Sequence, residues 1–204
     1  MFLYIVEMVG AFAAAISGIR LASMKRFDWF GAYIVGLVTA LGGGTLRDVL
    51  LDIPVFWTRS WDYFAVTGIS MSVVIAFQKQ LVRRLNMLLV FDAVGLAMFT
   101  VIGVEKTLAI GLPVWVAIAM GLITGAFGGV LRDILINEEP LIFRKDIYAM
   151  ACLLGGVAYG VVMAFGGNAV ACGVACAVVT LTVRVLALRF GWHLPMMHPD
   201  DDGE

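Results

Sequence analysis

The chain has little charge for its length. Only 14% of its 204 residues are Asp, Glu, Lys or Arg, whereas 62% are hydrophobic and the mean hydropathy is +0.98. A soluble domain is usually about half apolar, so this composition excludes an ordinary soluble fold. The formal net charge of −1 also lacks the basic excess that attracts nucleic acid. We therefore expect a membrane protein with no nucleic-acid partner.

The sequence also lacks the motifs of common enzymes. It contains no H-E-x-x-H, no G-x-S-x-G and no nucleotide P-loop. Its three cysteines, Cys152, Cys172 and Cys176, all fall in apolar segments, where a thiol packs as a small hydrophobic group. Its two histidines lie near the C-terminus without ligands at a useful spacing. We therefore predict no enzyme, no cofactor and no disulfide, and no metal site follows from these residues.

Long apolar segments are what the chain has in abundance. A helix needs roughly 20 apolar residues to cross about 30 Å of hydrocarbon, and seven segments of about this length are separated by short connections. The sequence therefore predicts an all-α, polytopic membrane protein with seven transmembrane helices in a single domain. The predicted spans are residues 2–23, 29–46, 63–81, 87–104, 113–135, 147–165 and 169–188.

Two stretches of the sequence match each other at a distance of 85 positions. Residues 36–51 read GLVTALGGGTLRDVLL, residues 121–136 read GLITGAFGGVLRDILI, and they agree at nine of sixteen positions. Spans one to three thus correspond to spans four to six. Since each unit has an odd number of helices, the two must cross the membrane in opposite senses, which gives an inverted repeat. We predict repeats at residues 1–85 and 86–168, an accessory seventh helix at 169–190 and a polar tail at 191–204.

Glycines and an Arg-Asp pair dominate both copies of the repeated stretch. Consecutive glycines weaken a helix, so they predict either an opened backbone that lines a wet cavity or close packing of helices. The Arg-Asp pair near the end of each span either faces a permeation pathway or forms a structural ion pair. The residues concerned are Gly42, Gly43, Gly44, Gly128 and Gly129, with Arg47, Asp48, Arg132 and Asp133.

Other polar residues fall inside the predicted spans. Glu7 and Asp92 occupy equivalent positions in spans one and four, and an intramembrane carboxylate is a functional candidate. Each either pairs with an arginine of the glycine stretch or attracts a cation. The hydroxyl groups of Ser17, Thr39, Thr100 and Thr124 either line a pathway or bind their own helix backbone. Tyr63 and Tyr148 begin equivalent spans, where an aromatic belt is expected.

The basic residues are distributed unevenly between the two sides. Eleven of the 14 Lys and Arg residues follow spans one, three, five and seven. Positive residues favour the cytoplasmic side, so we predict a prokaryotic plasma-membrane protein with its C-terminus in the cytoplasm and its N-terminus outside. The basic groups on the cytoplasmic side are also expected to contact anionic membrane lipids.

With GGGTLRD at residues 42–48 and GGVLRD at 128–133, the chain resembles the prokaryotic trimeric intracellular cation channels. The resemblance implies a homotrimer with one pore inside each subunit, lined by spans two and five, which kink at the glycines. It implies conduction of monovalent cations, potassium or sodium, chiefly potassium. In the second copy Phe127 replaces the first glycine, which argues against exact symmetry.

A second interpretation has equal support from the inverted repeat. Relatives of this domain are linked to movement of small amino acids such as glycine, and inverted repeats serve carriers as well as pores. A third interpretation, a structural membrane protein, would make the paired charges part of the scaffold alone.

Overall fold

The computed structural model describes residues 1–77, 85–143 and 147–192 of the 204, apart from the side chains of residues 85–88. These parts contain seven α-helices, two 3-10 helices and no strand. In chain order the elements are α1 (Phe2–Met24), α2 (Trp29–Leu50), η1 (Phe56–Arg59), α3 (Asp62–Ala76), α5 (Leu85–Ala109), α6 (Val114–Leu135), η2 (Leu141–Phe143), α7 (Ala149–Ala164) and α8 (Ala169–Phe190).

Local sequence explains where several helices begin and end. Asp28 caps α2 by accepting a hydrogen bond from the Gly31 N–H at 2.7 Å, and Asn168 caps α8 in the same way, since such side chains satisfy the free N–H groups of a first turn. Gly191 ends α8 with a left-handed φ of 62°, a conformation that glycine adopts without strain. The α2 and α5 helices extend four and five residues beyond the predicted ends of their spans.

The structure confirms the inverted repeat. Helices α2 and α6 differ by 85 residues at both ends, and η1 and η2 begin 85 residues apart. The turns repeat as well, because left-handed φ angles occur at Arg26 and Gly111 and again at Asp52 and Asn137. Each of these pairs is also separated by 85 residues. The second unit therefore reproduces the first in helix length and in turn conformation.

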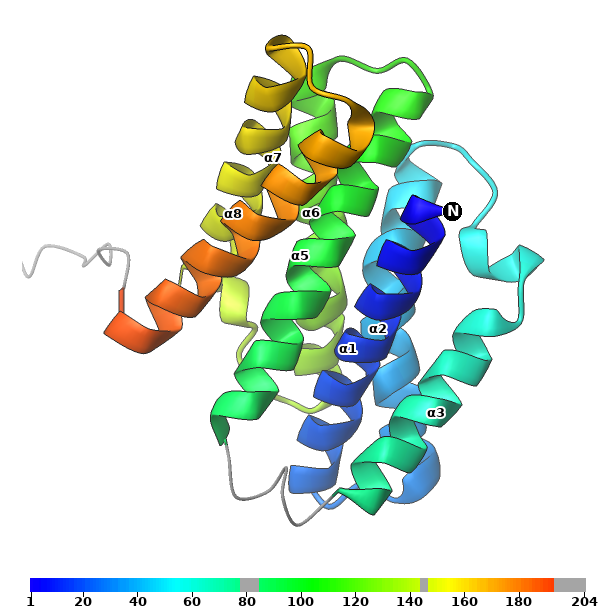
Figure 1. Ribbon diagram of the computed structural model, residues 1–204. Coiled ribbons are helices and arrows are strands. Elements are labelled where there is room, and N and C mark those ends of the chain that lie inside the picture. Colours follow the sequence, from blue (N-terminus) through cyan, green and yellow to red (C-terminus); the bar gives the residue numbers. More distant parts are fainter. Residues whose placement is uncertain (78–84, 144–146, 193–204) are drawn as a thin grey trace, which may run out of the picture.

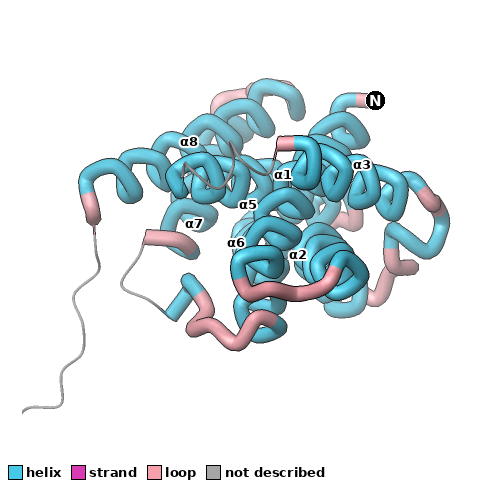
Figure 2. Tube along the Cα trace, turned by 90° about the horizontal axis from the view of Figure 1, so that it is seen from below, coloured by secondary structure: helices cyan, strands magenta, loops and turns pink. Residues whose placement is uncertain are grey.

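The helices pack side by side as a bundle (Figure 1). Helices α1, α2, α5 and α6 lie at the centre, while α3 covers one side and α7 and α8 cover the other (Figure 2). The seventh membrane helix, α8, packs on α5 and α7 and has no counterpart in the first unit. We call the end where α1 begins the N-terminal face and the end where α8 finishes the C-terminal face, which are the upper and lower ends in Figure 1.

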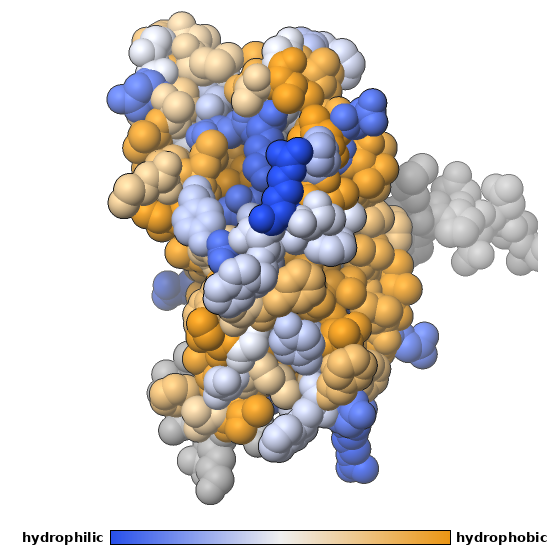
Figure 3. Space-filling model, turned by 90° about the vertical axis from the view of Figure 1, so that its right-hand side faces the viewer, coloured by the Kyte–Doolittle hydropathy of each residue, from blue (hydrophilic) through white to orange (hydrophobic). Residues whose placement is uncertain are grey.

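The outer surface is that of a membrane protein. Hydrophobic residues cover most of the side shown in Figure 3, and the most hydrophilic side chains gather mainly in its upper part. Four of the described helices, α1, α2, α6 and α8, are long and apolar enough to cross a bilayer by themselves. Exposed aromatic rings lie where helices begin, with Trp29 at the start of α2, Trp61 just before α3 and Trp115 in the first turn of α6. Such rings favour the two membrane interfaces.

Candidate functional site

The repeated glycines bring α2 and α6 into backbone contact. A Cβ atom on Gly43 would collide with the carbonyl oxygen of Thr124, and one on Gly128 would collide with the carbonyl oxygen of Thr39. Gly43 and Gly128 are 85 positions apart, and so are Thr39 and Thr124, so the two contacts are equivalent and the crossing lies on the pseudo-two-fold axis. Both helices continue without interruption through these glycines. Of the two alternatives for these glycines, the structure therefore shows close packing, for which the missing side chains leave room.

The other repeated glycines make room for side chains. Gly42 faces the end of Leu131, Gly44 faces the ring of Phe56, and Gly129 faces the hydroxyl group of Tyr148. Tyr148 and its counterpart Tyr63 are buried, with 2% and 5% of their surface exposed. The expected place for these tyrosines in an interfacial belt is therefore wrong. Their hydroxyl groups lie among buried polar groups of the bundle, where a tyrosine finds hydrogen-bonding partners.

Three of the four candidate hydroxyl groups bind their own helices. Thr39 donates to the Val35 carbonyl at 2.6 Å, Thr124 donates to Met120 at 2.6 Å, and Thr100 donates to Leu96 at 2.8 Å. Each bond reaches back four residues, a common arrangement for a buried hydroxyl group in a helix. Only Ser17 joins a group of charged side chains, as described below.

Each Arg-Asp pair ties the end of a helix to the loop that follows it. The Arg47 Nε–H donates to Asp48 Oδ1 at 2.8 Å, while Asp48 Oδ2 accepts from the Phe56 N–H at 2.8 Å. The second copy repeats this, because Arg132 Nε–H donates to Asp133 Oδ1 at 2.8 Å and Asp133 Oδ2 accepts from Leu141 N–H at 3.1 Å. All four side chains are buried. Each aspartate thus balances the charge of a buried arginine with one oxygen and accepts a hydrogen bond from a loop N–H with the other.

We expect Asp48→Asn to lower the free energy of unfolding by about 2 kcal/mol, because hydrogen bonds to a buried charge contribute roughly 1.5 to 3 kcal/mol. The protein in detergent should lose its folded, monodisperse form at a lower temperature. Asp52→Asn is the matched control. The Asp52 side chain is exposed and its backbone has a left-handed φ, and Asn137 has the same backbone conformation at the equivalent turn of the second unit. Equal melting of the two variants would contradict the role given to Asp48.

A charged cluster in the half of the bundle near the C-terminal face gathers three helices around Arg132. Its Nη1 donates to Ser17 Oγ of α1 at 3.0 Å and forms an ion pair with Asp92 Oδ1 of α5. Asp92 is 7% exposed, and its Oδ2 has no hydrogen-bond partner in the described part of the chain. The predicted pairing of Asp92 with an arginine of the glycine stretch is confirmed, and one carboxylate oxygen remains free to accept.

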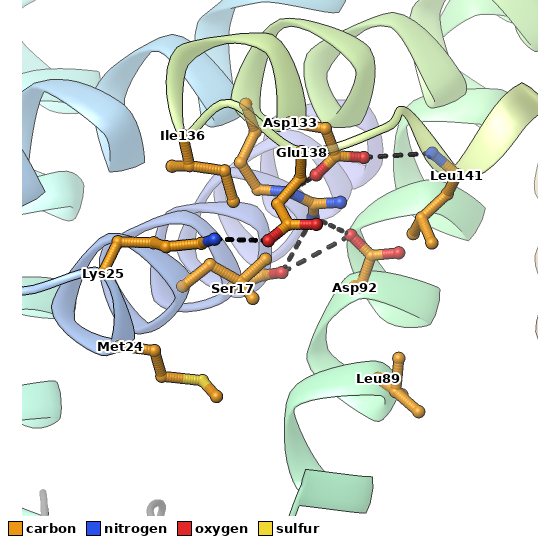
Figure 4. Close-up of a pocket in the computed structure, with 11 residues that line it drawn as sticks. Ser17, Met24, Lys25, Leu89, Asp92, Asp133, Ile136, Glu138 and Leu141 are labelled. Atoms are coloured by element: carbon orange, nitrogen blue, oxygen red, sulfur yellow. Dashed lines mark hydrogen bonds and ion pairs between the residues drawn. The ribbon is translucent and has the colours of Figure 1, made fainter.

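This cluster forms one wall of a pocket of about 310 Å³. The pocket lies near the C-terminal face, and Figure 4 shows Lys25 and Glu138 paired with each other beside Ser17. Its lining has three carboxylates and two cations. The lining residues are Ser17, Leu21, Met24, Lys25, Leu89, Asp92, Arg132, Asp133, Ile136, Glu138 and Leu141.

Near the N-terminal face, the equivalent carboxylate has a different partner. Glu7, the counterpart of Asp92, pairs with Lys106 Nζ at 2.9 Å instead of with Arg47. The Lys106 amine also lies 5.0 Å from the centre of the Phe56 ring. The Arg47 guanidinium makes a second cation–π contact with the same ring, at 5.6 Å. Phe56 packs edge-on against Tyr63 at 4.7 Å. Lys106, Glu7 and Phe56 thus lie together in the half of the bundle near the N-terminal face.

Sequence reasoning missed Lys106 and Phe56 as members of the site. Lys106 lies beyond the predicted end of span four, and Phe56 lies in a connection outside the predicted spans. The available signal was the register of the repeat. Lys106 aligns with Leu21, and Phe56 aligns with Leu141. The two units therefore differ in charge at the first of these positions, and at the second only one unit has an aromatic ring.

Comparison with known families agrees with this architecture. A family model described as "Glycine transporter" matches the chain twice, at residues 4–79 and 89–164, and these two matches are again 85 residues apart. The UPF0126 inner membrane protein YadS of Escherichia coli K12 is 41% identical over the full length of both chains. The UPF0126 membrane protein YvgT of Bacillus subtilis is 34% identical over 94% of each chain.

Solved structures show the same fold. An orthologue of the TRIC trimeric intracellular cation channel from Rhodobacter sphaeroides is 34% identical with a TM-score of 0.86, covering 93% of this chain and 98% of its own. A structure that describes conductance through TRIC cation channels gives a TM-score of 0.87 at 29% identity, covering 98% and 99% of the two chains. The protein therefore belongs to the family of membrane proteins that includes the UPF0126 proteins and the prokaryotic TRIC channels.

Proposed function

We propose that the protein is a monovalent-cation channel whose pathway runs inside each subunit, past the crossing of α2 and α6. The observation that carries the proposal is the pocket near the C-terminal face, whose lining includes Asp92, a carboxylate with one oxygen that has no hydrogen-bond partner among the described residues. The pocket lining has one more negative than positive group, which favours entry of a cation. Similarity to TRIC cation channels supports the same function.

The proposal extends to the assembly and its orientation. We infer a homotrimer that conducts potassium in preference to sodium, by similarity to a protein described as a trimeric intracellular cation channel. The C-terminal face would lie in the cytoplasm and the N-terminal face outside, as the distribution of Lys and Arg indicates. Membrane lipids would contact the exposed apolar side chains and the basic groups at the cytoplasmic side. The proposal includes no catalytic step.

The pathway in this proposal has a wide end and a narrow end. A cation would enter the pocket near Asp92 and Ser17, pass the backbone crossing at Gly43 and Gly128, and meet Glu7 with its bound Lys106. Arg47 and Arg132 would stand one near each end, each with its charge balanced by the neighbouring Asp48 or Asp133. The Lys106 amine is a tethered cation at the narrow end, and it would compete with a permeating ion for Glu7.

We expect Lys106→Met to increase potassium flux. The substitution removes the tethered cation and leaves Glu7 to attract a potassium ion, while the methionine keeps most of the side-chain volume. Purified protein in liposomes, loaded with a potassium-sensitive dye, gives the flux directly. Arg59→Met is the matched control, because it removes an exposed positive charge from the connection between α2 and α3. A flux that falls below that of the unmodified protein would contradict closure by Lys106.

Transport of a small amino acid is the second candidate function. Two observations favour it: the family model that matches both repeats is described as a glycine transporter, and the two ends of the bundle differ, with a pocket beside Asp92 at one end and an ion pair between Glu7 and Lys106 at the other. That asymmetry is expected of an alternating-access carrier built from inverted repeats. Saturable counterflow of glycine in liposomes without unitary currents would favour this function over the channel.

A further inference from the structure

A second buried carboxylate lies outside the proposed pathway. Glu105 precedes Lys106 in α5, but its side chain turns away from Glu7 and toward α8. It is 8% exposed, and its Oε1 has no hydrogen-bond partner among the described residues. A buried carboxylate that is ionised and unpaired is costly, and such a group in the membrane usually has a function.

The surroundings of Glu105 are apolar and shaped to admit the carboxyl group. Gly173 in the second turn of α8 leaves space beside it, since a Cβ atom there would lie 3.0 Å from Glu105 Oε1. The same point lies 3.2 Å from the Phe2 ring and 3.3 Å from a methyl group of Val101. Residues of three helices, α1, α5 and α8, thus surround this point next to the carboxyl oxygen. This enclosure suits a neutral carboxylic acid better than a carboxylate.

No cation from the neighbouring described elements balances Glu105. On α5 and α1 the nearby charges are Lys106 and Glu7, which are paired with each other. On α7 the facing titratable group is the buried Tyr159, and on α8 these groups are Cys172 and Cys176, both buried. None of the described Lys, Arg or His side chains forms an ion pair with Glu105. The charge of an ionised Glu105 would therefore remain uncompensated while α8 is in place.

We propose that Glu105 binds a proton in the seam between α5 and α8, and that α8 docks on α5 while this carboxyl group is neutral. Release transfers the proton from the carboxyl oxygen to water at the N-terminal face, four residues before the end of α5, and leaves a carboxylate that must be hydrated. Hydration requires α8 to move away from α5. The seventh helix would then report the pH at that face, a function that goes beyond cation conduction and does not depend on it.

Infrared difference spectroscopy tests the proton site directly. Spectra of the full chain in lipid at high and low pH should differ by the carbonyl band of a protonated carboxyl group, and Glu105→Gln should remove that band. Glu7→Gln is the matched control, since Glu7 is paired with Lys106 and its loss should leave the band unchanged. A band that persists in Glu105→Gln would overturn the proposal. Because the band is independent of ion flux, this result does not depend on the proposed channel function.

A second pair of variants keeps the carboxyl group in place. Gly173→Ser adds a hydroxyl group next to Glu105 Oε1, whereas Gly173→Ala adds the same Cβ atom without it. A hydrogen bond to the charged form favours that form, so the serine variant should lose the proton about one pH unit lower than the alanine variant, a tenfold change in proton affinity. Identical titration of the two variants would overturn the assignment to Glu105.

Discussion

Gly43→Ala and Gly128→Ala will each destabilise the protein by roughly 3 kcal/mol, the upper part of the range for an overpacked interior. A methyl group at either position collides with a backbone carbonyl oxygen of the facing helix, and no change of side-chain rotamer can relieve that collision. Helices α2 and α6 must separate instead. For a chain of this size the change corresponds to a fall of about 10 °C in the unfolding midpoint, measured by size-exclusion chromatography after heating in detergent.

Gly68→Ala in α3 is the control for this prediction. A Cβ atom at Gly68 meets nothing within 4 Å, and alanine favours a helix over glycine, so the variant should be at least as stable as the unmodified protein. Gly42→Ala should lie between the two cases, because the facing group is the end of the Leu131 side chain. Equal stability of Gly43→Ala and Gly68→Ala would show that α2 and α6 do not touch at their glycines.

Arg132→Met will destabilise the protein by about 4 kcal/mol, the magnitude typical of removing one partner from a buried ion pair. Two carboxylates, Asp92 and Asp133, share this guanidinium group, and both lose their counter-charge in the variant. A second substitution should restore part of the loss. Asp92→Asn in the same chain removes one uncompensated charge, so Arg132→Met with Asp92→Asn should be more stable than Arg132→Met alone.

The measurement is the same thermal unfolding in detergent. Arg59→Met is the matched control, because Arg59 is exposed and its replacement should change the midpoint by little. Additive destabilisation by Arg132→Met and Asp92→Asn, with no recovery in the double variant, would contradict the ion pair. A recovery in the double variant would measure the coupling of the two side chains directly.

The fold could be predicted from the sequence because its strongest signals are global. The length of each apolar segment fixes the helices, and the match of residues 36–51 to 121–136 fixes the inverted repeat. The pairing of Asp92 with an arginine of the glycine stretch was one of two alternatives that the sequence left open, and the structure shows it with Arg132. The ends of α2 and α5 did not follow. Both helices run past their charged residues, since Arg47 and Lys106 find partners inside the bundle.

The details of the site depend on contacts that sequence spacing does not encode. Gly43 was consistent with an opened helix or with a close crossing, and only the position of Thr124 on α6 decides for the crossing. The Thr39 hydroxyl group could equally line a pathway or donate a hydrogen bond to its own helix. In the structure it donates to the Val35 carbonyl oxygen. Lys106 reaches Glu7 across 99 residues of chain, so its part in closing the N-terminal end depends on how α1 and α5 pack.

The central claim is that the pathway inside the bundle conducts cations, and the reversal potential in a planar bilayer tests it most directly. Purified protein between solutions of unequal potassium chloride concentration should show unitary currents that reverse near the potassium equilibrium potential. Currents that reverse near the chloride potential would contradict the account. The absence of unitary currents together with saturable glycine counterflow would contradict it as well and would identify a carrier.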